Sequence, residues 1–402
     1  MTLLDTDILL DWLLRRGLDG LDEAELLREF CEKCREAGLM VSRALSFIDT
    51  LHPVHEGRIY RWRDDSVEEP AATDYARTDQ GGPAAESWQR SPFFHLLQTG
   101  EEELRRRIGF GEAPDFSVIQ EMKDLGHTDY VVFIHRFAGD TKIGDMDGVY
   151  SAWSTRHSEG FSDANIVALR RLVPALALAI KSAALARIAD TLVQVYLGRD
   201  AGRRVLEGSI QRGVADRVEA ALWFSDLRSF TAITDTAKPS EVIPLLNDYA
   251  EAVITSIHEA GGDVLKLMGD GTLAIFDASD PAQGCRAALH AKDLAKERIL
   301  AVSARRAEAG LPVTQAYLGL HVGEVLFGNI GSPERLDFTV VGPAVNEVAR
   351  IAAMCRSVER KLLVSTDFHD AAAAEDRARL VSVGRYALRG VGAAQDLYTV
   401  VA

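Results

Sequence analysis

The chain has 402 residues, of which 47% are hydrophobic and 26% are charged, a composition typical of globular proteins rather than disordered ones. Its length exceeds the usual size of one domain, so we expect two. The formal net charge of −15 provides no general attraction for nucleic acids or anionic lipids, which disfavours both as partners. Four cysteines make no disulfide framework in a chain this long and suit a reducing compartment.

The sequence contains no clear export signal or membrane anchor. The segment MTLLDTDILLDWLL carries Asp5, Asp7 and Asp11, where a secretory signal has basic and uninterrupted apolar residues. The most apolar run, Leu172 to Ile180, is much shorter than the roughly 20 residues that a membrane span needs. We therefore predict a cytoplasmic protein without a membrane span.

Residues 1–162 mix helix and strand patterns and are predicted to form the first domain. The pattern predicts a helix over Leu21–Leu39 with Gly38 at its C-terminal cap, then two strands within 45–63 around a turn. Proline and glycine make 64–115 rich in loops, with one helix near 93–107. Three further strands are predicted: Phe116–Met122, Asp129–Phe137 and Gly148–Thr155.

Two groups of side chains in this domain raise the question of a ligand. Cys31 and Cys34 with His52 and His55 resemble a zinc pattern, but cysteines three apart on a helix are more often neighbours in a core. A set of aromatic residues could line a ligand pocket, although core packing explains them better: Trp62, Trp88, Trp153 and Phe137.

Residues 163–215 are predicted to form a long helix and a coupling linker. Apolar residues recur at alternating steps of three and four, as in a coiled coil: Ile166, Leu169, Val173, Leu176, Ile180 and Ala183, resuming at Ile188, Leu192 and Val195. Pro174 should kink this helix. A parallel dimer helix is favoured, and a helix buried in its own domain is the alternative.

Residues 216–402 alternate between strands and helices and form the third region. A strand at Val218–Phe224 precedes a helix at Ser240–Ala260 and a hairpin at Asp263–Phe276. A helix over 281–309 is followed by two strands within Gln315–Ile330, joined near Gly323, and by a short helix over 343–356. This order predicts an α+β domain with helices over one face of a sheet.

Two acidic residues occupy the ends of strands in this region. Asp226 follows the apolar strand ALWFS, and Asp270 lies at the tip of the turn in LKLMGDGTLAIF. Neighbouring carboxylates would repel each other, and divalent cations relieve that repulsion while assisting phosphoryl transfer. Taken singly, Asp226 could instead cap a helix and Asp270 could simply form a turn.

Four further polar residues could bind a nucleotide. Asn346 and Arg350 are four residues apart on one helix, where Asn can position a sugar oxygen and Arg can hold a phosphate. Lys266 precedes Asp270 in a strand, and Thr339 lies in the strand DFTVV. Single polar residues in strands usually face solvent, which is the alternative for both.

The motifs ALWFSDLRSFT, LKLMGDGTLAIF and ERLDFTVVGPAVNEVAR resemble the catalytic domain of class III adenylate and guanylate cyclases. The resemblance covers 216–402 with three motifs in family order. It implies a ferredoxin-like βαββαβ domain that dimerises head to tail, so that each active site takes residues from both chains.

The resemblance also implies a role for each matching residue. Asp226 and Asp270, with the backbone carbonyl of Leu227, match the ligands of two Mg²⁺ or Mn²⁺ ions. Asn346 and Arg350 match the pair that stabilises the transition state from the partner subunit. The remaining substrate contacts match as follows: Lys266 and Thr339 for the purine, Phe230 and Thr231 for the triphosphate turn, and Arg389 and Arg335 for phosphates.

Lys266 favours ATP, because a guanine-reading site has Glu at that position in the family. Thr339, where many members have Asp, resembles the threonine-type adenylate cyclases, a subgroup in which bicarbonate sensitivity is a hypothesis. The expected reaction is therefore ATP to cyclic AMP and pyrophosphate in a symmetric homodimer. A guanylate or pyrimidine nucleotide cyclase, or an idle nucleotide-binding regulator, is the alternative.

The order of elements in about residues 20–180 is similar to that of GAF-type or PAS-like sensor domains, and GFSDANIVALRRLVPALALAI looks like a GAF closing helix, so residues 1–162 are expected to form a GAF/PAS-like regulatory domain. YLGRDAGRRVLEGSIQRG resembles the coupling element of regulated cyclases. These resemblances imply a regulatory domain with a small-molecule effector, whereas a dimer scaffold without a ligand is the alternative.

Overall fold

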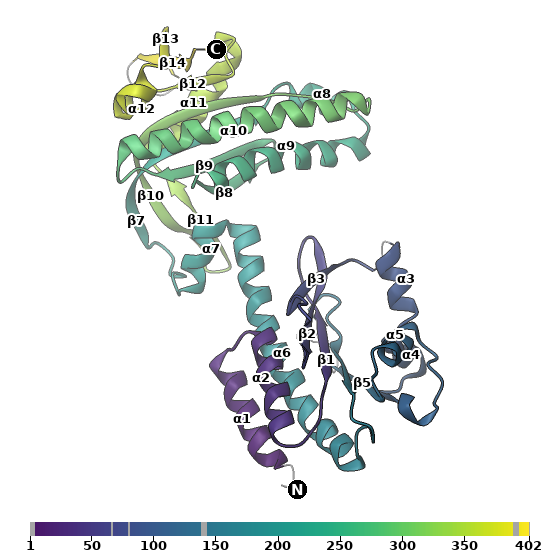
Figure 1. Ribbon diagram of the computed structural model, residues 1–402. Coiled ribbons are helices and arrows are strands. Elements are labelled where there is room, and N and C mark those ends of the chain that lie inside the picture. The colour runs from purple at the N-terminus through teal and green to yellow at the C-terminus, as the bar shows by residue number, and fades with distance from the viewer. Residues whose placement is uncertain (1–4, 66, 79–80, 138–142, 389–393, 402) are drawn as a thin grey trace. The chain divides into compact units, whose positions relative to one another are not determined.

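The computed structural model describes residues 5–65, 67–78, 81–137, 143–388 and 394–401. It divides into two compact units, Met1–Leu192 and Val193–Ala402, each with its own sheet (Figure 1). The two units are considered separately below.

The first unit is built on a six-stranded antiparallel sheet in the order β3-β2-β1-β6-β5-β4. Its elements in chain order are α1 (Thr6–Asp19), α2 (Glu23–Glu36), β1 (Arg43–Asp49), β2 (His55–Arg63), β3 (Ala72–Ala76), α3 (Pro83–Gln89), α4 (Pro92–Thr99), β4 (Glu103–Arg106), the 3₁₀ turn η1 (Ile108–Phe110), α5 (Ser117–Asp124), β5 (Asp129–Arg136), β6 (Gly148–Thr155) and α6 (Asp163–Leu197).

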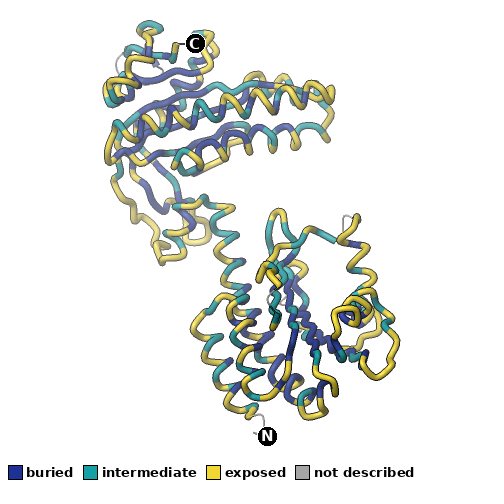
Figure 2. The backbone as a smooth tube through the Cα atoms, viewed as in Figure 1, coloured by how far each residue is buried: buried dark blue, intermediate teal, exposed yellow. Residues whose placement is uncertain are grey.

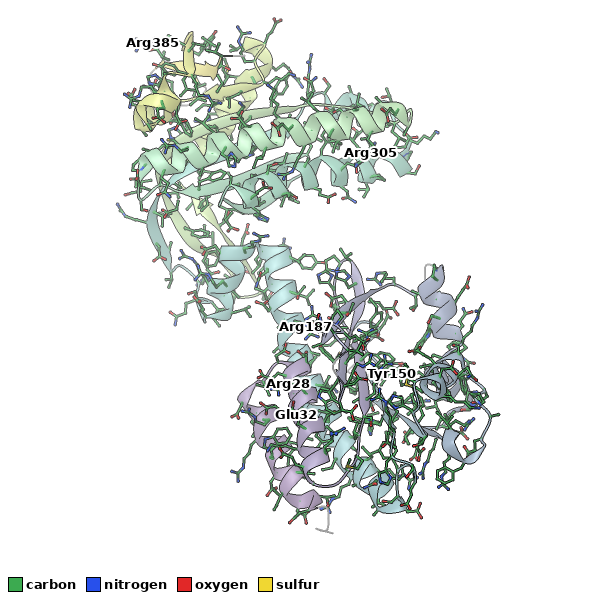
Figure 3. The ribbon with its side chains drawn as sticks, in the orientation of Figure 1. Arg28, Glu32, Tyr150, Arg187, Arg305 and Arg385 are labelled. Atoms are coloured by element: carbon green, nitrogen blue, oxygen red, sulfur yellow. The ribbon has the colours of Figure 1, made fainter. Side chains whose placement is uncertain are left out.

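Both faces of this sheet are buried, as Figure 2 shows for its central strands. Val131 and Phe133 of β5 pack with α1, α2 and α6, whereas Val132 and Ile134 point to the opposite core, where α4 and α5 pack. Successive side chains of a strand face opposite sides, so one strand serves two cores. In the second core the ring of Tyr150 (Figure 3) stacks on Phe47 with centroids 4.7 Å apart.

The helix α6 is an integral part of the first unit. Its apolar residues from Ile166 to Ile188 are mostly buried in that unit's core, and Arg187 forms an ion pair with Glu23 of α2 (Figure 3). The interpretation as a helix buried in its own domain therefore holds over this stretch, and the dimer seam predicted there is wrong. Pro174 lies inside the helix.

By length and apolar composition alone, α6 is the one helix among the described residues that would suffice to cross a membrane. Such a test is also passed by the core helix of a folded domain, and the buried face of α6 is of that kind.

Most predicted elements of the first unit occur, with two exceptions. The helix expected near 93–107 is shorter, Pro92–Thr99, and Glu103–Arg106 forms the strand β4. Residues Phe116–Met122 were expected to be a strand, but Ser117–Asp124 forms the helix α5. Its buried residues, Ile119 and Met122, are three apart, which is the spacing of a helix face. The helix α2, with Gly38 following it at φ 90°, and the strands β1, β2, β5 and β6 match the predictions.

The cysteines and aromatic residues that could have bound a ligand in the first unit mainly pack in its core. Cys31 and Cys34 are fully buried in the core, and burial raises the pKa of both thiols. Within the described part of the chain, neither cysteine joins a cluster of potential metal ligands. The aromatic residues pack as expected for a core, as when Trp153 meets Phe30 edge to face with centroids 5.6 Å apart.

The second unit is built on an eight-stranded sheet in which β10, β7, β9 and β8 are consecutive neighbours. Its elements are α7 (Arg199–Leu206), β7 (Ala215–Leu227), α8 (Phe230–Thr236), α9 (Pro239–Glu259), β8 (Asp263–Met268), β9 (Gly271–Asp277), α10 (Pro281–Glu308), β10 (Ala316–Ser332), β11 (Arg335–Val341), α11 (Pro343–Val358), β12 (Leu362–Val364), α12 (Thr366–Ala371), α13 (Ala374–Arg377), β13 (Leu380–Tyr386) and β14 (Gln395–Val400). The run β7-α9-β8-β9-α10-β10 is the predicted βαββαβ arrangement, with antiparallel neighbours throughout.

The central strand β7 separates two cores of this unit. Ala221 and Trp223 pack under α9 and α10, which lie side by side in Figure 1, whereas Ala220 and Leu222 pack with α11 and α7. Helices therefore cover both faces of the sheet around β7, and the expectation of helices over one face only is wrong.

The two strands predicted within Gln315–Ile330 form one continuous strand, β10. Gly323 was expected to join them, but its backbone pairs with Ala220 of β7. A Cβ atom at Gly323 would lie 2.9 Å from the Cβ of Ala344 on α11. The glycine therefore permits close packing of α11 on the strand, which is a common role of glycine inside a strand.

Candidate active site

Asp226 and Asp270 lie together, as the sequence predicted. Asp226 is near the end of β7, just before the chain leaves the sheet, and Asp270 is in the tight turn between β8 and β9. Strands β7 and β9 are paired, with Ser225 opposite Thr272. The Oδ2 atom of Asp270 accepts a hydrogen bond from the backbone N–H of Leu227 at 3.1 Å.

These residues line a cleft of about 200 Å³, which we call the aspartate cleft. The hairpin turn at 269–272 forms one wall, and Leu246 and Tyr249 of α9 form another. The cleft is thus open to a small ligand next to both carboxylates.

The electrostatics of the cleft favour a bound cation. The Oδ1 atom of Asp226 is buried and has no hydrogen-bond partner among the described residues. Burial, followed by the negative charge of Asp270, raises the pKa of Asp226 to about 6, and Arg356 of α11 partly offsets this shift. An unpartnered buried carboxylate costs free energy, which a divalent ion would remove.

The donor set fits Mg²⁺ or Mn²⁺. Two carboxylates and a main-chain carbonyl offer hard oxygen ligands, and Mg²⁺ is often held by one or two carboxylates together with substrate phosphates. Asp226, Asp270 and the carbonyl of Leu227 are the residues that would hold it.

Lys266 and Thr339 belong to a second group of polar residues. This group also contains Asp337, which was not singled out from the sequence. The ammonium of Lys266 on β8 forms an ion pair with Asp337 on β11. Asp337 and Thr339 are two apart on the same strand, so they share a face. Asp337 stands two residues before Thr339 within the quoted motif, and that period of two was the available signal.

Asn346 and Arg350 do not line the aspartate cleft of their own chain. On α11, it is instead Arg356, near the other end of the helix, whose positive charge partly offsets the rise in the pKa of Asp226. Asn346 precedes it by ten residues, which is about 15 Å along a helix. In the described residues, the side chains of Asn346 and Arg350 form no hydrogen bond or ion pair, so both are available to another molecule.

The other predicted phosphate contacts are more dispersed. Phe230 begins α8, directly after Ser229, which adopts φ 57°, and packs partly against the core. Thr231 is exposed on the same turn, and Arg335 is exposed at the start of β11. Arg389 lies outside the described residues.

Residues 214–401 match the family model described as the adenylate and guanylate cyclase catalytic domain. The match spans the full ferredoxin-like core and both groups of polar residues described above. This segment is therefore similar to cyclase catalytic domains. The first unit lies outside the match.

Known relatives are similar to about half of the chain or less. An uncharacterized protein of Mycobacterium tuberculosis is 34% identical over 205 residues, covering 49% of this chain and 36% of that protein. An adenylate cyclase of Anabaena cylindrica is 32% identical over 161 residues, or 39% of this chain and 31% of its own length. The aligned stretch thus spans about a third of these curated relatives.

Among solved structures, the adenylyl cyclase CyaB from P. aeruginosa aligns with 47% of this chain and 96% of its own. The sequence identity is 21% and the TM-score is 0.43.

Proposed function

We propose that residues 214–401 convert ATP to 3′,5′-cyclic AMP and pyrophosphate. The observation that carries this proposal is the buried, unpartnered Oδ1 atom of Asp226 beside Asp270, within a segment that matches the cyclase family model. In the reaction, the 3′-oxygen of the ribose loses its proton and forms a bond to the α-phosphorus, while the bond to the pyrophosphate oxygen breaks in line.

Divalent cations held by Asp226, Asp270 and the Leu227 carbonyl would supply positive charge to the reacting oxygens and phosphates. The protein's own groups orient the substrate. Asn346 holds a ribose oxygen, and Arg350 presents its planar guanidinium to the α-phosphate, where negative charge develops. Phe230 and Thr231, with Arg335 and Arg389, bind the triphosphate.

The adenine preference rests on Lys266 and Thr339. The Lys266 ammonium can donate a hydrogen bond to a ring nitrogen of adenine, and the Thr339 hydroxyl can accept one from the exocyclic amino group. The carboxylate of Asp337, which pairs with Lys266, restricts where that ammonium lies. Guanine presents a carbonyl and a protonated nitrogen at the same edge, so this pairing favours ATP over GTP.

The active site is proposed to form between two copies of the chain. Asn346 and Arg350 lack partners in the described part of their own chain, and neither lines the aspartate cleft. A symmetric head-to-tail dimer brings these residues to the partner's aspartates and gives two equivalent sites.

The first unit is proposed to be a GAF-type sensor that regulates turnover through the end of α6. Its six-stranded antiparallel sheet, closed by α6, is in keeping with such a domain. After α6, the backbone N–H groups of Arg199 and Asp200 donate to the carboxylate of Asp263 at 3.2 and 3.3 Å. Asp263 begins β8, the strand of Lys266, so a shift of α6 reaches the substrate-binding strand.

The test is to incubate full-length protein with ATP, GTP, CTP or UTP and Mg²⁺ or Mn²⁺, and to identify products by mass spectrometry. Cyclic AMP from ATP, in excess over the other cyclic nucleotides, is expected. Preferred turnover of GTP or a pyrimidine nucleotide would overturn the base assignment. Nucleotide binding without any cyclic product would identify an idle regulator. Candidate small molecules added to the same assay test the sensor.

A further inference from the structure

The second unit, which is the proposed catalytic unit, contains another cavity besides the aspartate cleft. This cavity has a volume of about 170 Å³ and lies on the face of the sheet that α9 and α10 cover. We call it the α10 cavity. Its walls are almost entirely apolar and come from α10, α9 and the sheet: Trp223, Val253, Ala295, Ile299, Leu318 and Leu362. The helices above it are held together by Arg305 of α10 (Figure 3), which bonds to Asp248 of α9 at 2.9 Å.

Three lysines lie around these apolar walls: Lys292, Lys296 and Lys361. Lys292 is mostly buried and pairs with Asp293 at 2.5 Å. The other two are more accessible, and across the described residues neither forms an ion pair. Two uncompensated positive charges therefore lie at an apolar cavity in a chain whose formal net charge is −15.

The amide of Gln315 adds a polar group to the same cavity. Its Oε1 atom is buried and has no hydrogen-bond partner among the described residues. A buried acceptor without a hydrogen bond lowers the stability of the folded state. Rotation of the amide by 180° exchanges its oxygen and nitrogen, so Gln315 can accept a hydrogen bond from a ligand or donate one to it.

We propose that the α10 cavity binds a small amphiphilic carboxylate that acts as an effector of the catalytic unit. An apolar cavity of about 150 Å³ is known to hold benzene, so this one suits an apolar body of roughly six to eight carbons. The carboxylate meets Lys296 and Lys361, and the chain or ring lies against the apolar walls. A nucleotide, with three or more charges and a polar sugar, does not fit such walls.

An occupant of the α10 cavity lies next to the catalytic carboxylates. Ser225, Val253 and Ala316 line both this cavity and the aspartate cleft. Ser225 immediately precedes Asp226, and its hydroxyl accepts a hydrogen bond from the indole of Trp223 at 2.9 Å. A ligand that moves Trp223 or Ser225 thus changes the end of β7, and with it the position of Asp226.

The test measures binding of octanoate to full-length protein by isothermal titration calorimetry, with 1-octanol as the uncharged ligand of equal chain length. One octanoate per chain is expected, bound at least fivefold more tightly than 1-octanol. The double variant K296Q/K361Q should bind octanoate about tenfold more weakly, since two charge contacts are lost. K238Q removes a lysine elsewhere in the unit and should leave octanoate binding unchanged. Equal binding of both ligands, or undiminished binding to the double variant, overturns the proposal.

A second variant tests the location. A295F places a ring inside the α10 cavity and should abolish octanoate binding. If A295F fails to fold, the lysine variants still decide the question, because they leave the apolar core intact. No octanoate binding at millimolar concentration also overturns the proposal. Binding is measured without nucleotide, so its result is independent of cyclase turnover: a protein that binds octanoate as described but makes no cyclic nucleotide contradicts only the proposed function.

Discussion

Asp270 and Leu227 are joined by a hydrogen bond of 3.1 Å from the backbone N–H of Leu227 to the Oδ2 atom of Asp270. This bond ties the turn between β8 and β9 to the end of β7. It positions one carboxylate through the main chain, whereas the buried Oδ1 atom of Asp226 has no partner among the described residues. The two aspartates are therefore chemically unequal before any ligand arrives.

The first prediction is that Asp226→Ala abolishes metal-dependent cyclic nucleotide formation. The variant removes a ligand that the chain cannot replace, while the bond between Asp270 and Leu227 remains. Product formation at saturating Mg²⁺ and Mn²⁺ measures the effect. Asp235→Ala, at an exposed position of α8, is the control and should retain activity. Substantial turnover by Asp226→Ala would refute the assigned metal site.

The second prediction concerns sites shared between chains. Arg350→Ala should lower kcat about 100-fold or more, as expected when one donor to the transition state is lost. Mixing it with inactive Asp226→Ala should restore part of the activity, because one intact site per mixed dimer is rebuilt. Activity of the mixture is compared with each variant alone, with dimers verified by light scattering. No recovery in verified mixed dimers would show that the sites are not shared.

The third prediction is that Asp337 sets the position of Lys266. Asp337→Ala should raise KM for ATP about threefold to tenfold with a smaller change in kcat, because an ammonium on an exposed strand loses one charged partner. Asp337→Glu should recover most of the loss. Steady-state kinetics with ATP and GTP provide both numbers. A fall in kcat alone, with unchanged KM, would contradict a positioning role.

The fourth prediction is a pH dependence of stability in the first unit. Burial raises the pKa of Asp49 to about 7, although the hydrogen bond from Tyr75 acts in the opposite direction. The folded state then holds a proton on Asp49 that the unfolded chain releases near pH 4. Stability from this group is full below pH 4 and falls as the pH rises towards 7.

Asp49→Asn should remove this loss, which is on the order of 2–4 kcal/mol at about 1.4 kcal/mol per pKa unit. Urea unfolding of the full chain at pH 5 and pH 8, compared with the exposed control Asp11→Asn, measures it. Equal pH dependence of the Asp49→Asn variant and the original protein would disprove the assignment to this carboxyl group.

The fifth prediction tests how closely the end of α6 packs on β8. Gly198 adopts φ 91°, and a Cβ atom there would lie 2.5 Å from the carbonyl oxygen of Val264. Gly208 has a similar φ of 97° but open space around it. Gly208→Ala should lower the free energy of unfolding by about 1 kcal/mol, because only its positive φ disfavours alanine. Gly198→Ala should lower it by about 2–3 kcal/mol, because the clash with Val264 is added. Urea unfolding of both variants gives the difference, and equal costs would mean that the contact is unimportant.

Much of the second unit was predictable because its signals are local. Strands and helices of βαββαβ order follow from apolar periodicity, and Asp226 and Asp270 stand at recognisable strand ends. The continuity of β10 was not predictable, because Gly323 has the same appearance in a turn and in a strand against which Ala344 packs closely. Likewise, the seam of α6 reveals an apolar face but does not reveal which surface covers it.

The pairing of Lys266 with Asp337 illustrates a different limit. Both residues are charged and exposed in part, and 71 residues separate them. Only the adjacency of β8 and β11 brings them together, and that adjacency depends on the path of the whole sheet. The period of two places Asp337 on the same face as Thr339, but no local pattern indicates that Lys266 pairs with Asp337.

The exposed face of α6 has a consequence for how two copies of the chain associate. Most of the helix's apolar residues from Ile166 to Ile188 are enclosed in the first unit's core, but Leu178, Val195 and Tyr196 are exposed and leave apolar surface for a partner chain. Under the proposed function, dilute protein should lose specific activity as dimers dissociate. Output in a cell would then rise more steeply than the amount of protein made, so modest changes in expression would act as an additional control on cyclic nucleotide levels.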